Sequence, residues 1–336
     1  MRRFLEVLIA FLTMSLFRAG RVSSFSTTPA TPSTFTRLSK AADVASFVDR
    51  HDNYLLDCDG VLWTGDIPLP GSVETVIALK KAGKRVVFIT NNSSKSRRQY
   101  KQKFEKFGIP GITEADIVTS GSALAEYVSL QHPGIKTVYS IGEDGFFEEL
   151  EKVGLELVHD RESDHIITDE GFGKLEGMQH PPVEAVIGLD QGFSYRKLCM
   201  ASFYIQRGAH FVGTNLDTSD RMGSYLIPGT GPLLQSISNA CGVEPVVIGK
   251  PNPLLIKQIL EVNGFEASRT CMIGDRLDTD IAFGNNGGIT SALVMTGVTS
   301  EEKLHGTTDT NMIPTVVLDC LGALLAGQDA GMHSKM

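Results

Sequence analysis

The feature that most constrains the fold is a regular alternation of short apolar runs with amphipathic segments along most of the chain. Residues 85–90 (RVVFIT) form a continuous apolar, β-branched run, which is typical of a strand buried on both faces. Residues 95–107 follow with a basic amphipathic pattern that ends at Gly108, as expected of a helix. Because strands that alternate with helices form parallel sheets with right-handed crossovers, we expect an α/β fold with a Rossmann-like parallel-sheet core.

The length and the order of these elements indicate two domains. The chain has 336 residues, which is more than one hydrophobic core usually holds. A second series of expected strands and helices lies in the middle of the chain. We therefore interpret residues 132–242 as an α/β cap domain inserted into a core made of residues 41–131 and 243–322, with a C-terminal tail over residues 323–336.

Composition excludes several classes of protein. Hydrophobic residues make up 42% and charged residues 21%, which is the balance of an ordinary globular protein. The formal net charge is -8, so no nucleic-acid partner is expected. No apolar run reaches the roughly 20 residues that span a bilayer, so the mature form is expected to lack a membrane segment. The five cysteines are an odd number without a Cys-x-x-Cys pair, which argues for reduced thiols rather than disulfides or a zinc site.

The first forty residues have the character of a targeting presequence. They contain six basic residues and one acid, and an apolar stretch over residues 4–17 follows Arg2 and Arg3. Small residues fit a cleavage before Phe25, and the Ser-, Thr- and Pro-rich segment after it is typical of a transit peptide. We expect residues 1–40 to lie outside the fold and to resemble the bipartite plastid presequences of algae; single-step import into a plastid or a mitochondrion is the alternative.

Chemistry-bearing residues recur where expected strands end. Asp57 and Asp59 directly follow the first strand; alone they would fit an exposed acidic turn, and the spacing of an EF-hand is missing. Three further polar segments each follow an expected strand, and ligands of open α/β sheets bind at the carboxyl edge of the strands. The side chains expected to meet there are Asp57, Asp59, Thr90, Asn91, Asn92, Lys250, Asp275 and Asp280.

These residue types suit the hydrolysis of a phosphate ester. A carboxylate that attacks a dianionic phosphate meets electrostatic repulsion, which a hard divalent cation with oxygen ligands offsets. Asp57, Asp59 and Asp275 can supply ligands for Mg²⁺. Lys250 would add a fixed positive charge, and the Thr90 hydroxyl with nearby backbone N–H groups would hold the phosphoryl oxygens.

Four segments in this order resemble the haloacid dehalogenase superfamily of phosphatases: DCDGVLWTGD, FITNNSSKSRRQYKQKFEKFGI, VIGKPNP and CMIGDRLDTDIAFGNNGG. The resemblance covers residues 45–322. It is strongest to the members with a large α/β cap inserted after the third core strand, which include the phosphoglycolate, para-nitrophenyl and pyridoxal phosphate phosphatases. It implies a Rossmann-like core, an inserted cap and Mg²⁺ as cofactor.

The resemblance also implies a role for each matched residue. Asp57 would be the nucleophile that forms an aspartyl-phosphate, and Asp59 the general acid and base. Thr90 and Asn91 would bind the phosphoryl group with Asn92 close by, and Lys250 would bridge Asp57 and the phosphate. The metal would be held by Asp57, by Asp275 and by the backbone carbonyl of Asp59, with Asp280 orienting the site from outside the ligand set.

The substrate that the resemblance implies is a small phosphorylated acid. The first expectation is 2-phosphoglycolate, hydrolysed to glycolate and phosphate, because photosynthetic carbon fixation produces it in plastids. A broader phosphatase for pyridoxal phosphate, glycerol phosphate or sugar phosphates is the alternative, and a non-catalytic protein that binds a phosphorylated ligand is a more distant one. The loop at residues 188–195 resembles the cap loop that reads the substrate, but related animal enzymes carry His where this chain has Gly192. A homodimer through the cap also stays open.

Several polar residues allow two interpretations. Lys95, Arg97 and Arg98 fit either a solvated helix face or a contribution to attracting an anionic substrate. Cys58 fits a packed strand residue better than an oxidation-sensitive thiol. Four of the eight histidines show no metal-ligand spacing and are interpreted as structural or surface residues, namely His51, His159, His165 and His210.

Overall fold

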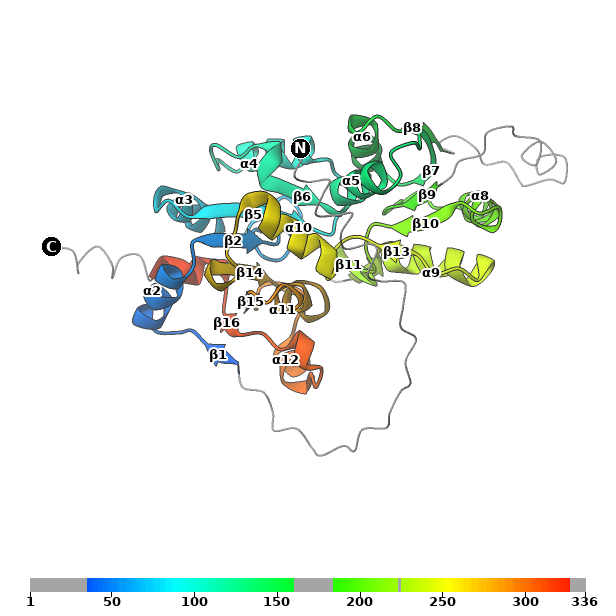
Figure 1. The fold of residues 1–336 in the computed structure, drawn as a ribbon. Helices are drawn as coiled ribbons and strands as arrows, with labels where there is room; N and C mark the ends of the chain where they lie inside the picture. The colour runs from blue at the N-terminus through cyan, green and yellow to red at the C-terminus, as the bar shows by residue number, and fades with distance from the viewer. Residues whose placement is uncertain (1–34, 160–183, 223–224, 327–336) are drawn as a thin grey trace. The chain divides into compact units, whose positions relative to one another are not determined.

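The computed structural model describes residues 35–159, 184–222 and 225–326, and Figure 1 shows its helices and strands. The larger of its sheets has seven parallel strands in the order β1-β16-β15-β14-β2-β5-β6. Their bounds are β1 Thr36–Arg37, β2 Asn53–Leu56, β5 Arg85–Thr90, β6 Ile117–Thr119, β14 Thr270–Gly274, β15 Thr290–Val294 and β16 Val316–Leu318. The predicted α/β fold with a parallel-sheet core is thus confirmed.

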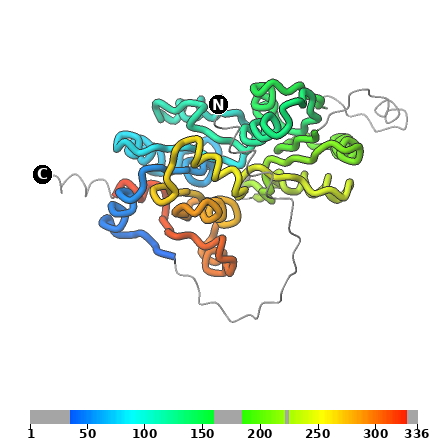
Figure 2. The backbone as a smooth tube through the Cα atoms, viewed as in Figure 1, coloured from blue at the N-terminus to red at the C-terminus, as the bar shows by residue number. Residues whose placement is uncertain are grey.

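A second sheet has five parallel strands in the order β13-β10-β9-β7-β8. Their bounds are β7 Thr137–Ile141, β8 Glu156–Val158, β9 Glu184–Ile187, β10 His210–Gly213 and β13 Val246–Val247. Figure 2 traces the chain from the first sheet into the second and back. Strand β13 corrects the sequence analysis, which assigns it to the core: it pairs with β10 of the second sheet. A short apolar strand does not reveal from its sequence which sheet edge it joins.

Helices cover both sheets, and two hairpins complete the fold. The helices are α2 Ala41–Arg50, α3 Ser72–Lys81, α4 Arg97–Lys106, α5 Ser120–Gln131, α6 Asp144–Lys152, α8 Tyr195–Gln206, α9 Thr230–Cys241, α10 Pro253–Asn263, α11 Ala282–Asn286 and α12 Glu301–Gly306. Helix α4 begins two residues after the predicted start at residue 95, because Ser96 is its N-cap and forms a capping box with Gln99. The hairpins pair β3 (Trp63–Thr64) with β4 (Ile67–Pro68) and β11 (Ser219–Met222) with β12 (Tyr225–Pro228).

The start of the fold also differs from the prediction. Residues 1–34 lie outside the described residues, but the predicted presequence extends to residue 40, and its last part is structured. Strand β1 pairs with β16, the Leu38 side chain is buried, and Arg37 forms ion pairs with Glu301 and Asp319. A two-residue edge strand leaves too short a pattern to separate it from the Ser- and Thr-rich segment before it.

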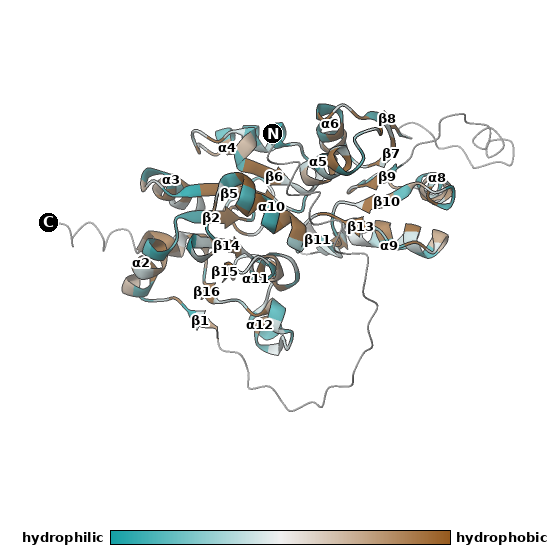
Figure 3. Cartoon of the chain, viewed as in Figure 1, coloured by the Kyte–Doolittle hydropathy of each residue, from teal (hydrophilic) through white to brown (hydrophobic). Residues whose placement is uncertain are grey.

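One apolar core connects the two sheets. It contains Leu55 and Ile89 from the first sheet and Val138, Val186 and Val212 from the second. Figure 3 shows the apolar colouring along the strands and the polar colouring on the outer turns of the helices. Within the described part of the chain, no helix combines the length and the hydropathy needed to cross a membrane.

Candidate active site

Asp57 lies at the carboxyl edge of the larger sheet, directly after β2. Its backbone N–H donates to the Ile273 carbonyl at 2.9 Å, which continues the ladder between β2 and β14. The Asp57 side chain is buried, and its carboxylate lies with those of Asp275 and Asp280 in a group whose ligand oxygens are all within 4.8 Å of one another. The sheet therefore brings Asp57 together with two acids that lie more than two hundred residues later in the sequence.

Lys250 places a buried ammonium inside this group. Its Nζ donates to Asp57 Oδ1 at 2.6 Å, to Asp280 Oδ1 at 2.7 Å and to the Ile89 carbonyl at 2.9 Å. The sequence pattern predicts Lys250 at the end of a core strand, but the residues before it belong to the second sheet: Gly249 N–H donates to the Thr214 carbonyl at 2.7 Å. Lys250 thus reaches the site from the neighbouring sheet.

Asp280 holds the site together rather than leaving oxygens free. Besides the bond from Lys250 to Oδ1, its Oδ2 accepts the backbone N–H groups of Asp275 and Arg276 at 3.1 and 3.0 Å. A side chain at Gly274 would collide with Asp280, since an added Cβ would lie 2.2 Å from its Cγ. Both Asp280 oxygens are therefore engaged, which fits the predicted orienting position.

Burial dominates the electrostatics of the carboxylates. Desolvation raises the pKa of Asp57 well above its ordinary range, against the opposing effect of Lys250. Desolvation, with the charge of Asp280, raises the pKa of Asp275 to about 7. Burial disfavours the charged form of Lys250, but Asp280 and Asp57 outweigh it and raise the pKa of the ammonium. The three carboxylates exceed the charge of one ammonium, so the site favours an additional cation.

Asp59 lies apart from the buried group, where solvent reaches its side chain. Its Oδ1 accepts a hydrogen bond from Trp63 Nε1 at 2.9 Å. Although water reaches it, the surrounding protein desolvates the carboxylate and raises its pKa, against the charge of Lys103. Gly60 makes the turn after it: its φ is +86°, and an added Cβ would lie 2.7 Å from Asp275 Oδ2.

The segment after β5 divides into different roles. Thr90 is buried, and its Oγ1 accepts the Asn92 backbone N–H at 3.1 Å. The Asn92 Oδ1 in turn accepts Ser94 N–H and Oγ–H at 2.9 and 2.7 Å. The Asn91 side chain is engaged within the protein, because it accepts Lys250 N–H at 2.8 Å and donates to the Lys250 carbonyl at 3.1 Å. Asn91 therefore positions Lys250.

The segment that follows β10 also reaches the site, and so does Arg276, which the sequence patterns did not indicate. Asn91 Nδ2 also donates to Asp217 Oδ1 at 3.1 Å, and Asn215 Nδ2 donates to the Asn91 carbonyl at 2.8 Å. Arg276 reaches the same region, where its Nη1 donates to the Ser219 carbonyl at 3.2 Å. Residues 214–217 follow strand β10, whose last residue is Gly213. The sequence allows two interpretations of residues 213–217, a contact with the active site or a capped turn, and the bond from Asn91 to Asp217 supports the contact.

The predicted substrate-reading loop rests on the larger sheet. Its Leu189 N–H donates to Ser93 Oγ at 2.9 Å, and Lys197 Nζ lies 2.6 Å from Asp190 Oδ2. Gly192 N–H donates to Asp190 Oδ1 at 2.8 Å. These contacts place residues 188–192 next to the segment that follows Thr90.

Of the basic residues Lys95, Arg97 and Arg98, the two arginines form ion pairs with α6. Arg97 lies 2.8 Å from Glu149, and Arg98 lies 2.9 Å from Glu148. They join elements of the two sheets and do not form the free basic face that the sequence suggests.

Cys58 is fully buried in the core, and all five cysteines are free, as predicted. His51 is structural, as predicted: its ring nitrogens contact the Phe47 carbonyl and Thr290 Oγ1.

The carboxylate group fits a hard divalent cation. Asp57 has a second oxygen besides the one on Lys250, and Asp275 has a second besides Oδ2, which accepts Val298 N–H at 2.6 Å. Oxygen donors in an excess of negative charge are the ligand set that Mg²⁺ favours. The Asp59 side chain does not belong to this group.

Comparison with known proteins agrees with this geometry. A family model described as haloacid dehalogenase-like hydrolase matches residues 54–156, and a HAD-hydrolase-like model matches residues 247–324. Phosphoglycolate phosphatase 2 of Arabidopsis thaliana is 38% identical over 272 residues, which are 80% of this chain and 90% of the relative.

Solved structures share the fold. The 4-nitrophenylphosphatase from Thermotoga maritima has a TM-score of 0.70 and 31% identity, over 83% of this chain and 97% of its own. A glycerol phosphate phosphatase from Mycobacterium tuberculosis, solved in complex with magnesium, has a TM-score of 0.69 and 29% identity, over 82% of this chain and 77% of its own.

Proposed function

Because the chain belongs to the haloacid dehalogenase-like hydrolases and is a phosphoric monoester hydrolase, we propose that it hydrolyses 2-phosphoglycolate to glycolate and phosphate with Mg²⁺ as cofactor. The observation that carries the chemistry is the Lys250 ammonium, which lies 2.6 Å from Asp57 in a buried group of carboxylates. The proposed identity of the substrate rests on the similarity of the chain to a phosphoglycolate phosphatase.

In the first step, a carboxylate oxygen of Asp57 attacks phosphorus and the bond from phosphorus to the glycolate oxygen breaks. Asp59 gives its proton to the leaving oxygen, which suits a carboxyl whose pKa is raised. The product on the enzyme is an aspartyl-phosphate at Asp57. Lys250 fixes Asp57 and offsets its charge, and the Thr90 hydroxyl lies at the end of the neighbouring strand to hold a phosphoryl oxygen.

In the second step, Asp59 takes a proton from water, the water oxygen attacks phosphorus, and the bond from phosphorus to Asp57 breaks to release phosphate. Mg²⁺, held by Asp57, Asp275 and the Asp59 backbone carbonyl, would neutralise negative charge on the phosphoryl group. Asn91 and Asp280 are positioning residues, because they hold Lys250 and the segment that carries Asp275 in place.

The test is phosphate release with and without Mg²⁺ from 2-phosphoglycolate, glycerol 3-phosphate, pyridoxal phosphate, sugar phosphates and a phosphopeptide. Asp57→Asn should abolish release from every ester, and the exposed Asp43→Asn is the matched control. A preference for glycerol 3-phosphate would favour the second candidate, which is supported by the likeness to a glycerol phosphate phosphatase. Similar rates on all esters would reject the substrate but keep the mechanism, and no release from any would support a binding protein.

The proposed place of action is a plastid, reached through a bipartite presequence, with the mitochondrion as the alternative. It rests on the basic, acid-poor composition of the chain's first part. Fusing residues 1–34 to a fluorescent protein in an alga with multi-membrane plastids tests it, and deletion of residues 1–24 should stop the fusion at the first membrane.

A further inference from the structure

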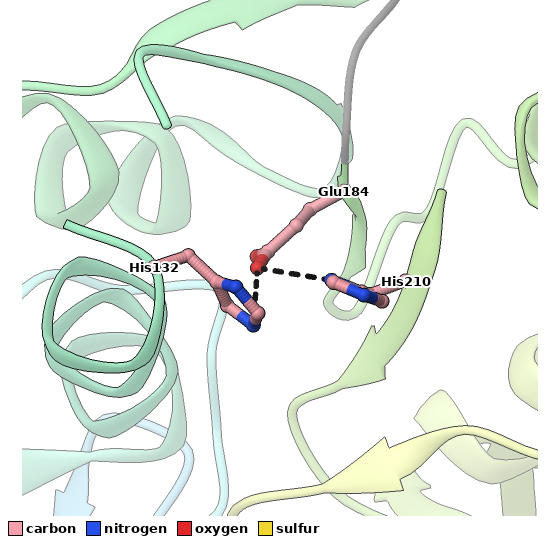
Figure 4. A group of neighbouring side chains, drawn as sticks. All are labelled: His132, Glu184 and His210. Carbon is pink, nitrogen blue, oxygen red and sulfur yellow. Dashed lines mark ion pairs between the residues drawn. The ribbon is translucent and has the colours of Figure 1, made fainter. Parts of the chain in front are cut away.

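A second group of candidate metal ligands lies in the smaller sheet, and Figure 4 shows it. Glu184 is the first residue of β9, and His210 is the first residue of β10, directly opposite it in the register. His132 follows the last residue of α5. The three side chains come from separate elements and point toward one another.

Glu184 makes this group unusual. The residue is fully buried, and neither carboxylate oxygen has a hydrogen-bond partner among the residues that the structure describes. Burial raises its pKa to about 7. Burying a carboxylate is costly unless a cation or a set of hydrogen-bond donors accompanies it, so the position calls for a positive partner.

The two imidazoles face this carboxylate at distances that suit metal ligands. His132 Nε2 lies 3.4 Å from Glu184 Oε1, and His210 Nδ1 lies 3.8 Å from the same oxygen. Two ligands held about 2.1 Å from a tetrahedral zinc ion are roughly 3.4 Å apart. Burial, with the charge of His210, lowers the pKa of His132, which keeps its imidazole in the neutral form that binds metals.

We propose that His132, Glu184 and His210 form a second divalent-metal site, which binds a transition metal such as Zn²⁺ and leaves a coordination position open. Imidazole nitrogens with one carboxylate favour Zn²⁺, whereas Mg²⁺ favours oxygen ligands alone. The His132 and His210 side chains are 32% and 53% exposed, so the ion can reach the site from solvent and keep a water or an external ligand.

This site is separate from the carboxylate group at Asp57. Glu184 and His210 begin their strands, whereas the residues that meet the larger sheet, Leu189 and Asn215, follow the ends of the same strands. Four-residue strands put the two edges roughly 10 Å apart or more. A bound ion would link the end of α5 to β9 and β10, so it should stabilise the smaller sheet against unfolding.

The test is calorimetric titration of the metal-free chain, purified without a histidine tag, with Zn²⁺ in the presence of excess Mg²⁺. We expect one Zn²⁺ per chain and a rise in melting temperature. Glu184→Gln keeps the shape of the side chain but should weaken this binding about 100-fold, as should His132→Gln with His210→Gln. Co²⁺ bound in place of Zn²⁺ should give the visible absorption of a tetrahedral site, and this spectrum should be lost in the same variants.

Two controls separate this site from others. His305→Gln changes an exposed histidine outside the group and should bind Zn²⁺ like the original chain. Asp275→Asn changes the other carboxylate group and should also leave Zn²⁺ binding intact. Unchanged Zn²⁺ affinity in a folded Glu184→Gln variant would overturn the proposal, as would loss of the binding in Asp275→Asn alone. The melting temperature of the metal-free Glu184→Gln variant should be no lower than that of the metal-free original chain. This measurement checks that the variant is folded.

Discussion

The Lys250 ammonium lies between the Asp57 and Asp280 carboxylates, 2.6 Å from one and 2.7 Å from the other, and its third hydrogen donates to the Ile89 carbonyl. All three donors of the ammonium are therefore used inside the protein. Lys250 has a structural and an electrostatic task at once, so its replacement should affect stability and catalysis together.

Lys250→Met should abolish phosphate release and lower the free energy of unfolding by about 3–5 kcal/mol, because it leaves buried carboxylates without their counter-charge. Urea unfolding without added metal measures the loss. Adding Asp57→Asn should restore part of it, since one of the unpaired charges is then removed. Lys81→Met changes an exposed lysine and is the control. An equal loss of stability in Lys250→Met and Lys81→Met would contradict the prediction.

Gly60→Ala should reduce activity sharply because the added Cβ would lie 2.7 Å from Asp275 Oδ2. Gly65 offers a matched control: its φ is +58°, and an added Cβ there meets nothing within 4 Å. Gly65→Ala should cost only the backbone strain, about 1 kcal/mol of folding free energy, with activity kept. Steady-state kinetics of both variants decide the matter, and equal activities would refute the steric explanation.

Removal of residues 1–40 should destabilise the protein, whereas removal of residues 1–34 should not. The longer deletion takes away β1 and the buried Leu38 side chain, whose burial is worth about 1.5–3 kcal/mol. Guanidinium unfolding of the two truncated chains measures the difference. Identical midpoints would mean that β1 and Leu38 contribute nothing to the fold.

Glu148 should make stability depend on pH in the acid range. Its desolvation cost is outweighed by bonds from Arg98, Ser96 and Lys152, which lower its pKa from 4.5 to about 2. A carboxyl whose pKa is lower in the folded than in the unfolded protein stabilises the fold at pH values above its unfolded-state pKa. This stabilisation is lost as the pH falls through its folded-state pKa. Glu148→Gln should therefore cost about 1–2 kcal/mol at pH 6, after allowance for solvent screening, and the cost should shrink steadily between pH 4.5 and pH 2.

Urea unfolding at several pH values measures this difference. Glu261→Gln removes an exposed glutamate of α10 and serves as the control. A difference between Glu148→Gln and the original chain that stays constant down to pH 2 would contradict the prediction.

The sequence allowed much of the site to be predicted because one rule governs its main residues. Asp57 and Asp275 directly follow parallel strands of the same sheet, Thr90 is the last residue of another, and such strands end at one edge. Lys250 lies beside Asp57 as the sequence predicts, but it does not follow a core strand, since the strand before it joins the second sheet. Strand pairing is a long-range choice that a two-residue run does not encode.

Other parts of the molecule left no local signal. His210 was interpreted as a structural or surface residue, yet it lies beside Glu184 and His132, which are far from it in the sequence. Only the register of β9 against β10 brings two of them together. Residues 214–217 do carry a local signal, because they follow a strand, but the contact of Asp217 with Asn91 depends on how the second sheet packs on the first.

The pairing of β13 with β10 has a consequence for building chimeras of this protein with its relatives. The backbone bonds to the second sheet continue through Ile248 and Gly249, and the next residue is Lys250. A graft that ends at residue 242 would exchange the inserted domain but leave its edge strand with the recipient. A chimera should instead take residues 246–250 from the same parent as the second sheet, and Lys250 must then still meet the recipient's residue at position 57.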